Sequence, residues 1–233
     1  MAALNSDIVL LAKFGYFKSS LFDNHLNRGR VGHRIEGRCR LQSKENQKRV
    51  VALLGSPRKK GNSTVLARQI ISGAKSAGAK VEAVYLNGLN IRPCQGCYAC
   101  KKKNSRGCAV DDDMQPLYPK LLESDAWIIA SPVYWFNMSA QTKIFMDRCF
   151  ALWNDDPEIN PLHKKRIAIA MSYGDSDPFS SGCVNALRSF QDAFRYAGAR
   201  IVGMVYGSAE KPGEIASNKE LMAEAEELGK KLI

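Results

Sequence analysis

Apolar runs rich in β-branched residues alternate along this chain with stretches of helical period. The strand-like runs cover residues 50–54, 81–86, 126–130, 166–171 and 201–206. Apolar positions at helical spacing predict helices over residues 63–77, 114–124, 140–152, 185–196 and 218–232. Two of these helices are followed by a glycine, Gly78 and Gly198, at the position where helices often end in a left-handed residue. The alternation predicts an α/β fold, a doubly wound five-stranded parallel sheet with helices on both faces.

The first 48 residues do not follow this pattern. Asn, Arg, Gly and Ser are scattered through residues 22–47 without a sustained period. We therefore expect residues 1–48 to be a leader or disordered extension and residues 49–233 to form one domain, with a cysteine-rich insertion at 92–110. Residues 1–49 hold ten Lys and Arg against four Asp and Glu, and so supply +6 of the net charge of +11.

Composition narrows the class of protein. No run approaches the roughly 20 apolar residues that span a bilayer. Seven cysteines, an odd number, do not suit the paired framework of a small secreted protein, which favours a reducing cytoplasm. The basic charge also admits a nucleic-acid-binding protein, but no helix-turn-helix, zinc-finger or RNP pattern is present. We expect neither a membrane nor a nucleic acid as partner; an acidic protein or an anionic ligand suits the charge.

Four cysteines lie within fifteen residues, at Cys94, Cys97, Cys100 and Cys108. The C-x2-C-x2-C opening is typical of thiolate runs that hold a cubane iron–sulfur cluster, because two-residue spacers let successive sulfurs turn inward. Arg and Lys side chains surround the run, and their charge is expected to lower the thiol pKa values and to offset the charge of a cluster. Structural zinc on four thiolates and redox-active or idle thiols are the alternatives.

The segment from residue 55 to residue 64 leads from the first strand directly into a helix. Its polar groups suit a phosphate, because hydroxyls, an amide and free backbone N–H groups converge on the positive end of the helix dipole. It is not a Walker A loop, because five residues instead of four separate Gly55 from Gly61 and Asn62 stands where the lysine of that loop would be; G-x-G-x-x-G is also absent. The alternative is that Asn62 or Ser63 only caps the helix. The candidate phosphate ligands are Ser56, Arg58, Asn62, Ser63 and Thr64.

Two further strand ends carry candidate ligand contacts. The third strand is followed by a loop that contains Pro132, Val133, Tyr134, Trp135 and Phe136, and these aromatic rings could stack on a planar ring system or pack in a subunit interface. A monomer that exposed them would have an unusual apolar patch, so we expect at least a homodimer. The loop after the fourth strand offers backbone N–H groups at Ser172, Tyr173 and Gly174, unless it is an ordinary connection.

Two sets of charged residues are predicted to have structural roles. The run of Asp111, Asp112 and Asp113 could bind a hard cation, but it directly precedes an apolar-periodic segment, so we expect one of these carboxylates to cap a helix. Lys143 and Asp147 form an i, i+4 pair, and together with Arg148 they are assigned to helix structure. Isolated histidines provide no acid–base constellation, and no catalytic side chain is expected.

Taken together, these motifs resemble those of the flavodoxin-like NAD(P)H-dependent FMN reductases, and among them the iron–sulfur flavoproteins. The resemblance rests on the first loop, on the cysteine run followed by Asp112-Asp113-Met114, and on Ser131-Pro132-Val133-Tyr134 with Lys143 and Asp147-Arg148 beyond. It implies FMN with its phosphate in the first loop and its ring against the loops that follow residues 131 and 171. It also implies a [4Fe–4S] cluster on the four cysteines, near the flavin of a neighbouring subunit in a homodimer or homotetramer.

We therefore expect an FMN-dependent oxidoreductase that passes electrons between a reduced donor and an acceptor. The cofactor carries the chemistry, and the protein supplies placement and tuning. With a cluster the expected donor is a ferredoxin; without one it is NAD(P)H. The alternatives are an NAD(P)H-dependent FMN or quinone reductase that has no cluster and, in another class, a zinc-stabilised flavodoxin-like binding module.

Overall fold

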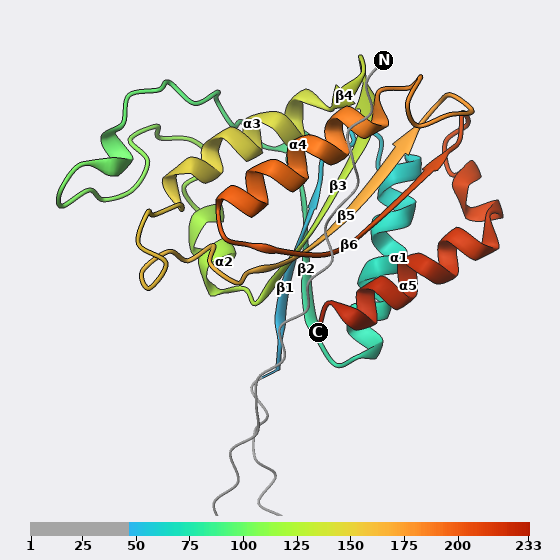
Figure 1. Cartoon of the computed structure of the whole chain (residues 1–233), viewed down its shortest axis with the longest axis horizontal. Coiled ribbons are helices and arrows are strands. Elements are labelled where there is room, and N and C mark those ends of the chain that lie inside the picture. Colours follow the sequence, from blue (N-terminus) through green and yellow to red (C-terminus); the bar gives the residue numbers. More distant parts are fainter. Residues whose placement is uncertain (1–46) are drawn as a thin grey trace, which may run out of the picture. The chain divides into compact units, whose positions relative to one another are not determined.

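The computed structural model describes residues 47–233 of the 233-residue chain, so the predicted leader lies almost wholly outside the described residues. Five strands pair in parallel in the order β2-β1-β3-β5-β6, as Figure 1 shows. The predicted doubly wound parallel sheet is thus confirmed. The strands are β1 (Arg49–Leu54), β2 (Lys80–Tyr85), β3 (Ala126–Tyr134), β5 (Arg166–Tyr173) and β6 (Arg200–Ser208).

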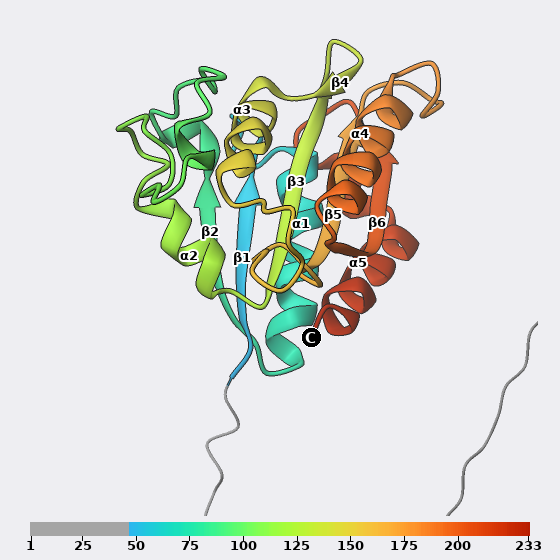
Figure 2. The same cartoon turned by 60° about the vertical axis from the view of Figure 1, so that its left-hand side comes forward.

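Helices cover both faces of this sheet (Figures 1 and 2). Side chains alternate along each strand, so Val51 and Leu53 pack with the first group of helices while Ala52 and Leu54 pack with the second. Because both faces of β1, β3 and β5 are buried, these three strands consist of nearly continuous apolar runs. The first group is α2 (Leu117–Glu123), α3 (Ala140–Arg148) and α4 (Cys183–Tyr196), and the second is α1 (Asn62–Ser76) and α5 (Lys219–Lys231).

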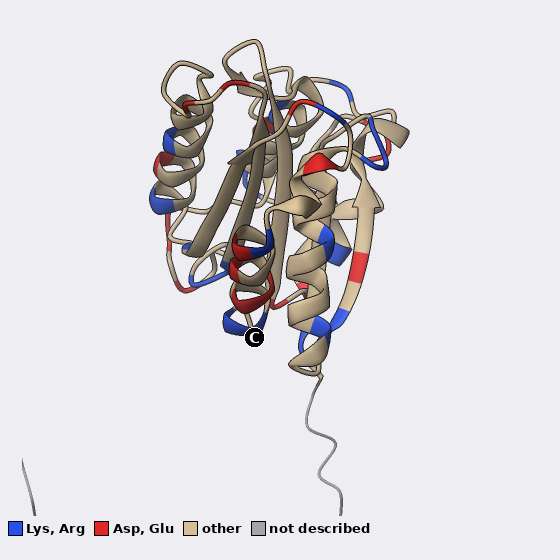
Figure 3. Cartoon of the chain, turned by 90° about the vertical axis from the view of Figure 1, so that its right-hand side faces the viewer, with Lys and Arg blue, Asp and Glu red and all other residues tan. Residues whose placement is uncertain are grey.

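Charged side chains lie on the helices, on the loops, at the beginnings of strands and, in the edge strand β2, also at its middle, where Glu82 lies (Figure 3). Strand β3 carries none, and strand β5 carries only Arg166, its first residue. The charge is therefore kept out of the middle of the sheet, where burial of an unpaired charge would be costly.

Several boundaries differ from the predicted ones. Strands β3 and β5 continue to Tyr134 and Tyr173, into segments that we predicted as loops. The extra length of β3 pairs with a sixth, two-residue antiparallel strand, β4 (Asn137–Met138). Helix α2 begins three residues later than predicted, and α3 gives way to a 3₁₀ turn, η3 (Cys149–Ala151). The glycines after α1 and α4 have the expected positive φ, 91° at Gly78 and 74° at Gly198.

The cysteine-rich segment projects from the body of the domain. It lies between the 3₁₀ turn η1 (Leu86–Gly88) and helix α2, and contains only the short turn η2 (Ala99–Lys101). Figure 2 shows it beside α3, on the side of the sheet where β2 is the edge strand. Within residues 47–233, the helices are all too short or too polar to cross a membrane.

Candidate functional site

The carboxyl ends of β1, β3 and β5 meet at one edge of the sheet, as parallel strands require. A cavity of about 180 Å³ lies there and brings together four segments that are far apart in sequence. Of the predicted cofactor contacts, Thr64, Trp135 and Phe136 do not line it. The residues that line it are Ser56, Arg58, Gly61, Asn62, Ser63, Pro132, Val133, Tyr134, Ser172, Tyr173, Gly174, Ala209, Glu210 and Pro212.

The first segment supplies the start of α1. Gly61 is the N-cap residue, and no side chain caps the helix, so the alternative that Asn62 or Ser63 serves as the cap is wrong. Ser63 is only 1% exposed, and its Oγ has no hydrogen-bond partner within the described part of the chain. A Cβ atom on Gly61 would lie 2.8 Å from Ser56 Oγ, so a larger residue would crowd this corner. A buried free hydroxyl at a helix N-terminus fits an anion.

Asn62 has a different role from the one that its position suggests. Its Nδ2 donates to the carbonyl oxygens of Ala209 at 3.1 Å and of Lys211 at 3.0 Å, and its Oδ1 accepts from Ile215 N at 3.4 Å. The amide therefore joins the start of α1 to the segment after β6. That segment supplies Ala209, Glu210 and Pro212 to the cavity, which sequence reasoning missed. These residues could have been found from the sequence, because they follow the fifth predicted strand and ligands bind at the carboxyl ends of parallel strands.

The second segment is a hairpin instead of the predicted loop. Pro132 and Val133 lie within β3, and Tyr134 pairs with Asn137 across a two-residue turn. Both turn residues have positive φ, 45° at Trp135 and 64° at Phe136, a conformation that usually requires Gly or Asn. Trp135 is 92% exposed. The hairpin thus exposes aromatic rings, of which only that of Tyr134 belongs to a residue lining the cavity.

The third segment ends β5 beside the same cavity. Ser172 and Tyr173 are buried, and burial raises the pKa of the Tyr173 hydroxyl. The Tyr173 carbonyl accepts from Ala209 N at 2.9 Å, which connects this segment to the one after β6. Gly174 then leaves the strand with open space around it, because a Cβ there would meet no atom within 4 Å.

The four predicted metal ligands line a second cavity, of about 280 Å³. Cys94 and Cys97 are exposed, and Cys100 and Cys108 are partly buried. No three His, Cys, Asp or Glu side chains between residues 47 and 233 are placed so as to hold a single metal ion. The four thiols thus line one cavity, but the described residues do not define a metal-ligand set, and the predicted metal site stays a prediction.

The pKa of the Cys100 thiol is shifted in the opposite direction from the predicted one. Burial raises the pKa of this thiol, and the neighbouring Lys101 opposes that effect without reversing it. The Lys101 ammonium lies 4.4 Å from the ring centroid of Phe150 and 5.1 Å from that of Trp153, and it donates to the Trp153 carbonyl. Positive charge therefore does not lower the pKa of Cys100 as predicted, because desolvation is the larger effect.

The other described cysteines lie in the core. Cys149 and Cys183 are buried, and burial raises the pKa of both thiols, to about 11 for Cys183. Buried thiols of high pKa are unreactive. Cys39 lies outside the described residues.

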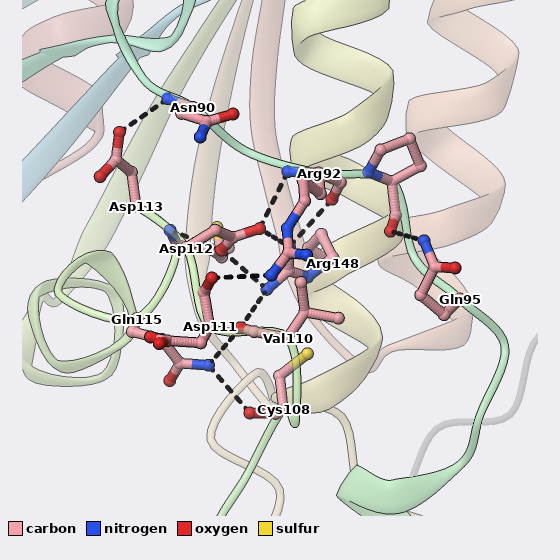
Figure 4. A network of polar contacts seen from close by, with 12 residues as sticks. Asn90, Arg92, Gln95, Cys108, Val110, Asp111, Asp112, Asp113, Gln115 and Arg148 are labelled. Carbon is pink, nitrogen blue, oxygen red and sulfur yellow. Dashed lines mark hydrogen bonds and ion pairs between the residues drawn. The ribbon is translucent and has the colours of Figure 1, made fainter.

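The aspartate run does not cap a helix as we predicted, since the N-cap of α2 is Pro116 and no side chain caps it. Asp112 instead forms a buried ion pair with Arg148, with Nη1 to Oδ2 at 2.6 Å (Figure 4). Arg148, which we assigned to helix structure, is thus part of the cysteine segment's base. The other half of that assignment holds, because Lys143 and Asp147 form a surface pair at 2.6 Å.

A sequence profile of the NADPH-dependent FMN reductases matches residues 48–213. The chain belongs to this family, and with its flavodoxin-like sheet it is a flavin oxidoreductase. The match begins one residue before β1 and includes all the segments around the first cavity.

Individual relatives support this family assignment. The chain is 31% identical over 184 residues to an iron–sulfur flavoprotein of Archaeoglobus fulgidus, covering 79% of this chain and 78% of the relative. It is 30% identical over 155 residues to the iron–sulfur flavoprotein of Methanosarcina thermophila, covering 66% and 77%. Among solved structures, an NAD(P)H:quinone oxidoreductase from Methanothermobacter marburgensis has a TM-score of 0.63 at 18% identity, covering 80% and 97%, which shows the shared fold.

Proposed function

We propose that this flavin oxidoreductase is an electron-transfer flavoprotein with two redox groups. FMN occupies the cavity at the carboxyl edge of the sheet, and a [4Fe–4S] cluster is held by Cys94, Cys97, Cys100 and Cys108. Electrons pass between a reduced donor and an acceptor. The observation that carries the proposal is that four thiols from one projecting segment line a single cavity in a chain of the FMN reductase family.

The groups that line the first cavity suit FMN by their chemistry. The free Ser63 hydroxyl and the backbone N–H groups at the start of α1 suit a phosphate, and Arg58 lines the same cavity. Pro132–Tyr134 could contact the flavin ring through apolar side chains. Ser172–Gly174 could bind its polar edge through backbone groups. Bound FMN would supply exchange of electrons or hydride, while these residues bind and orient it.

The second cavity fits an iron–sulfur cluster by the chemistry of its donors. Thiolates are the ligands of such clusters, and the two-residue spacers are those of known cluster-binding runs. Relatives that bear the name iron–sulfur flavoprotein support the same assignment. Free thiols persist in reducing compartments, and we accordingly place the protein in the cytoplasm.

The donor is tested by anaerobic mixing. Reduced ferredoxin is expected to bleach the flavin absorbance of cluster-loaded protein faster than NADPH does, because the exposed cysteine segment gives a protein donor access to the cluster. Protein stripped of its cluster is the control and should lose this advantage. Equal rates from ferredoxin with and without the cluster would contradict the proposed path.

A cluster-free NAD(P)H-dependent FMN or quinone reductase is the second candidate. It is favoured by the family profile, which is that of NADPH-dependent FMN reductases. In that case NAD(P)H reduces the flavin directly, and the thiols have no part in the reaction. The zinc-stabilised binding module is disfavoured as the main function, because the chain belongs to a family of enzymes.

We also propose a homodimer or homotetramer. The hairpin exposes three consecutive aromatic side chains, Tyr134 at 43%, Trp135 at 92% and Phe136 at 53%. Trp135 and Phe136 have positive φ, which strains the backbone of a non-glycine residue. Such strain is kept where a contact depends on it, and an exposed aromatic patch indicates a contact surface. Light scattering should give a mass of about two or four chains, and Trp135→Ser should shift it towards one. A stable wild-type monomer with bound flavin would contradict this.

A further inference from the structure

The base of the cysteine segment is a buried, two-pronged ion pair. Arg148 donates through Nη1 to Asp112 Oδ2 at 2.6 Å and through Nη2 to Asp112 Oδ1 at 3.1 Å. The two side chains are 0% and 1% exposed. A bidentate pair of this kind fixes orientation as well as distance.

The same guanidinium also bonds to the backbone on both sides of the cysteines. Its Nη1 donates to the carbonyl oxygen of Arg92 at 2.9 Å, two residues before Cys94, and its Nη2 donates to that of Val110 at 3.4 Å, two residues after Cys108. Figure 4 shows the Arg148 side chain between these two backbone segments. One side chain therefore joins the two ends of the cysteine segment, which we call its incoming stem (residues 90–93) and its outgoing stem (residues 109–114).

Asp112 contributes to the same junction from the outgoing stem. Its Oδ2 accepts from Arg92 N at 2.9 Å, and its Oδ1 accepts from Met114 N at 3.0 Å. Burial acts to raise the pKa of Asp112, but the hydrogen bonds from Arg148, Arg92 and Met114 outweigh it and lower the pKa below its ordinary value. The carboxylate is thus the charged partner that this geometry needs.

Arg148 is itself held by the body of the domain. It is the last residue of α3, and its carbonyl accepts from the buried Tyr118 hydroxyl at 3.1 Å. A second contact follows just beyond it, where Lys101 from the middle of the cysteine segment lies over Phe150. The last residue of α3 therefore anchors the segment at its base, and the following turn η3 contacts it at its middle.

Stability alone does not account for this pair. Replacing a buried ion pair by apolar residues of similar volume is often neutral or stabilising, so burial of the charges is not an efficient way to strengthen a core. What the pair adds is a buried bidentate contact between the two stems, which are also joined by exposed hydrogen bonds between Asn90 and Asp113 and between Arg92 and Asp111. Cys94 and Cys108, at the two ends of the segment, line the same cavity.

We propose that Arg148 is a positioning residue that aligns the two stems through Asp112, so that the four thiols face one cavity before any metal binds. This inference rests on the proposed cluster. Its first readout, however, is the metal-free protein, so it is decided separately from the cluster itself.

The test is hydrogen exchange of the metal-free protein with FMN bound. The main variant is Asp112→Asn with Arg148→Met, which leaves no buried charge unpaired, and Arg148→Lys is the conservative partner because an ammonium cannot reproduce the two-pronged contact. Amides of residues 92–114 should exchange at least about tenfold faster in the double variant, with Arg148→Lys in between, while β1 and β3 stay as in wild type. After supply of iron and sulfide, iron per FMN should fall in the same order.

Lys143→Met is the matched control, because it removes an ion pair from the same helix on the solvent side. It should leave both exchange and iron uptake unchanged. The proposal is overturned if the double variant shows wild-type exchange over 92–114, if exchange rises equally in β1 and β3, or if both Arg148 variants fail to fold and bind FMN. Wild-type protein that takes up no iron would defeat the cluster proposal, while the exchange data would still decide the role of Arg148.

Discussion

Cys97→Ser protein, prepared without oxygen, is expected to contain its full complement of FMN and almost no iron. Serine is a poorer ligand for iron than a thiolate, so one corner of the proposed cluster is lost. FMN should stay because its cavity is built from different strand ends, with no cysteine among its lining residues. Iron and flavin analysis of the same sample measures both quantities.

Electron uptake gives a second reading of this variant. Reduction of the flavin by reduced ferredoxin should be lost, whereas dithionite should still reduce it. Cys183→Ala is the matched control, because it removes a buried thiol outside the cysteine cavity and should keep both iron and ferredoxin-dependent reduction. Unchanged reduction by ferredoxin in Cys97→Ser would leave a cluster that has no part in the electron path.

Ser63→Ala is expected to weaken FMN binding by about 10- to 100-fold, since a hydrogen bond to a charged group contributes roughly 1.5 to 3 kcal/mol. Ser63 lines the cavity, and its buried hydroxyl has no hydrogen-bond partner among residues 47–233, so a phosphate is its expected acceptor. Binding of riboflavin, which has no phosphate, should not change. Isothermal titration of apoprotein with the two ligands measures this difference.

Thr64→Ala is the matched control for that variant. Thr64 is the next residue of α1, but its hydroxyl donates to the Arg58 carbonyl at 3.3 Å, and the residue does not line the cavity. Its loss should weaken FMN binding much less than the loss of Ser63. Equal affinity of the wild-type protein for FMN and riboflavin would contradict the phosphate site altogether.

The sheet could be predicted because its strands carry their own signal. Strands that are buried on both faces need continuous apolar runs, and residues 126–130 are all at most 1% exposed. The position of the first cavity followed from the rule that ligands bind at the carboxyl ends of parallel strands. The cysteines could be found because their spacing is local in the chain.

What could not be predicted depends on pairs that are distant in sequence. Arg148 and Asp112 are 36 residues apart, and neither carries a mark that distinguishes a buried partner from a helix-surface charge or a cap. Asn62 is in the expected place, but its bonds to Ala209 and Lys211 span about 150 residues. The hairpin at Trp135 was missed because aromatic residues rarely take positive φ, so the sequence contains no turn signal there.

The composition of wild-type protein tests the central claim most directly. Protein isolated without oxygen and supplied with iron and sulfide should contain about four iron atoms for each FMN, the ratio that one cubane cluster and one flavin per chain require. Wild-type protein that binds FMN but holds no iron, or holds zinc in its place, would contradict the account and leave a flavin reductase whose four clustered thiols serve another purpose.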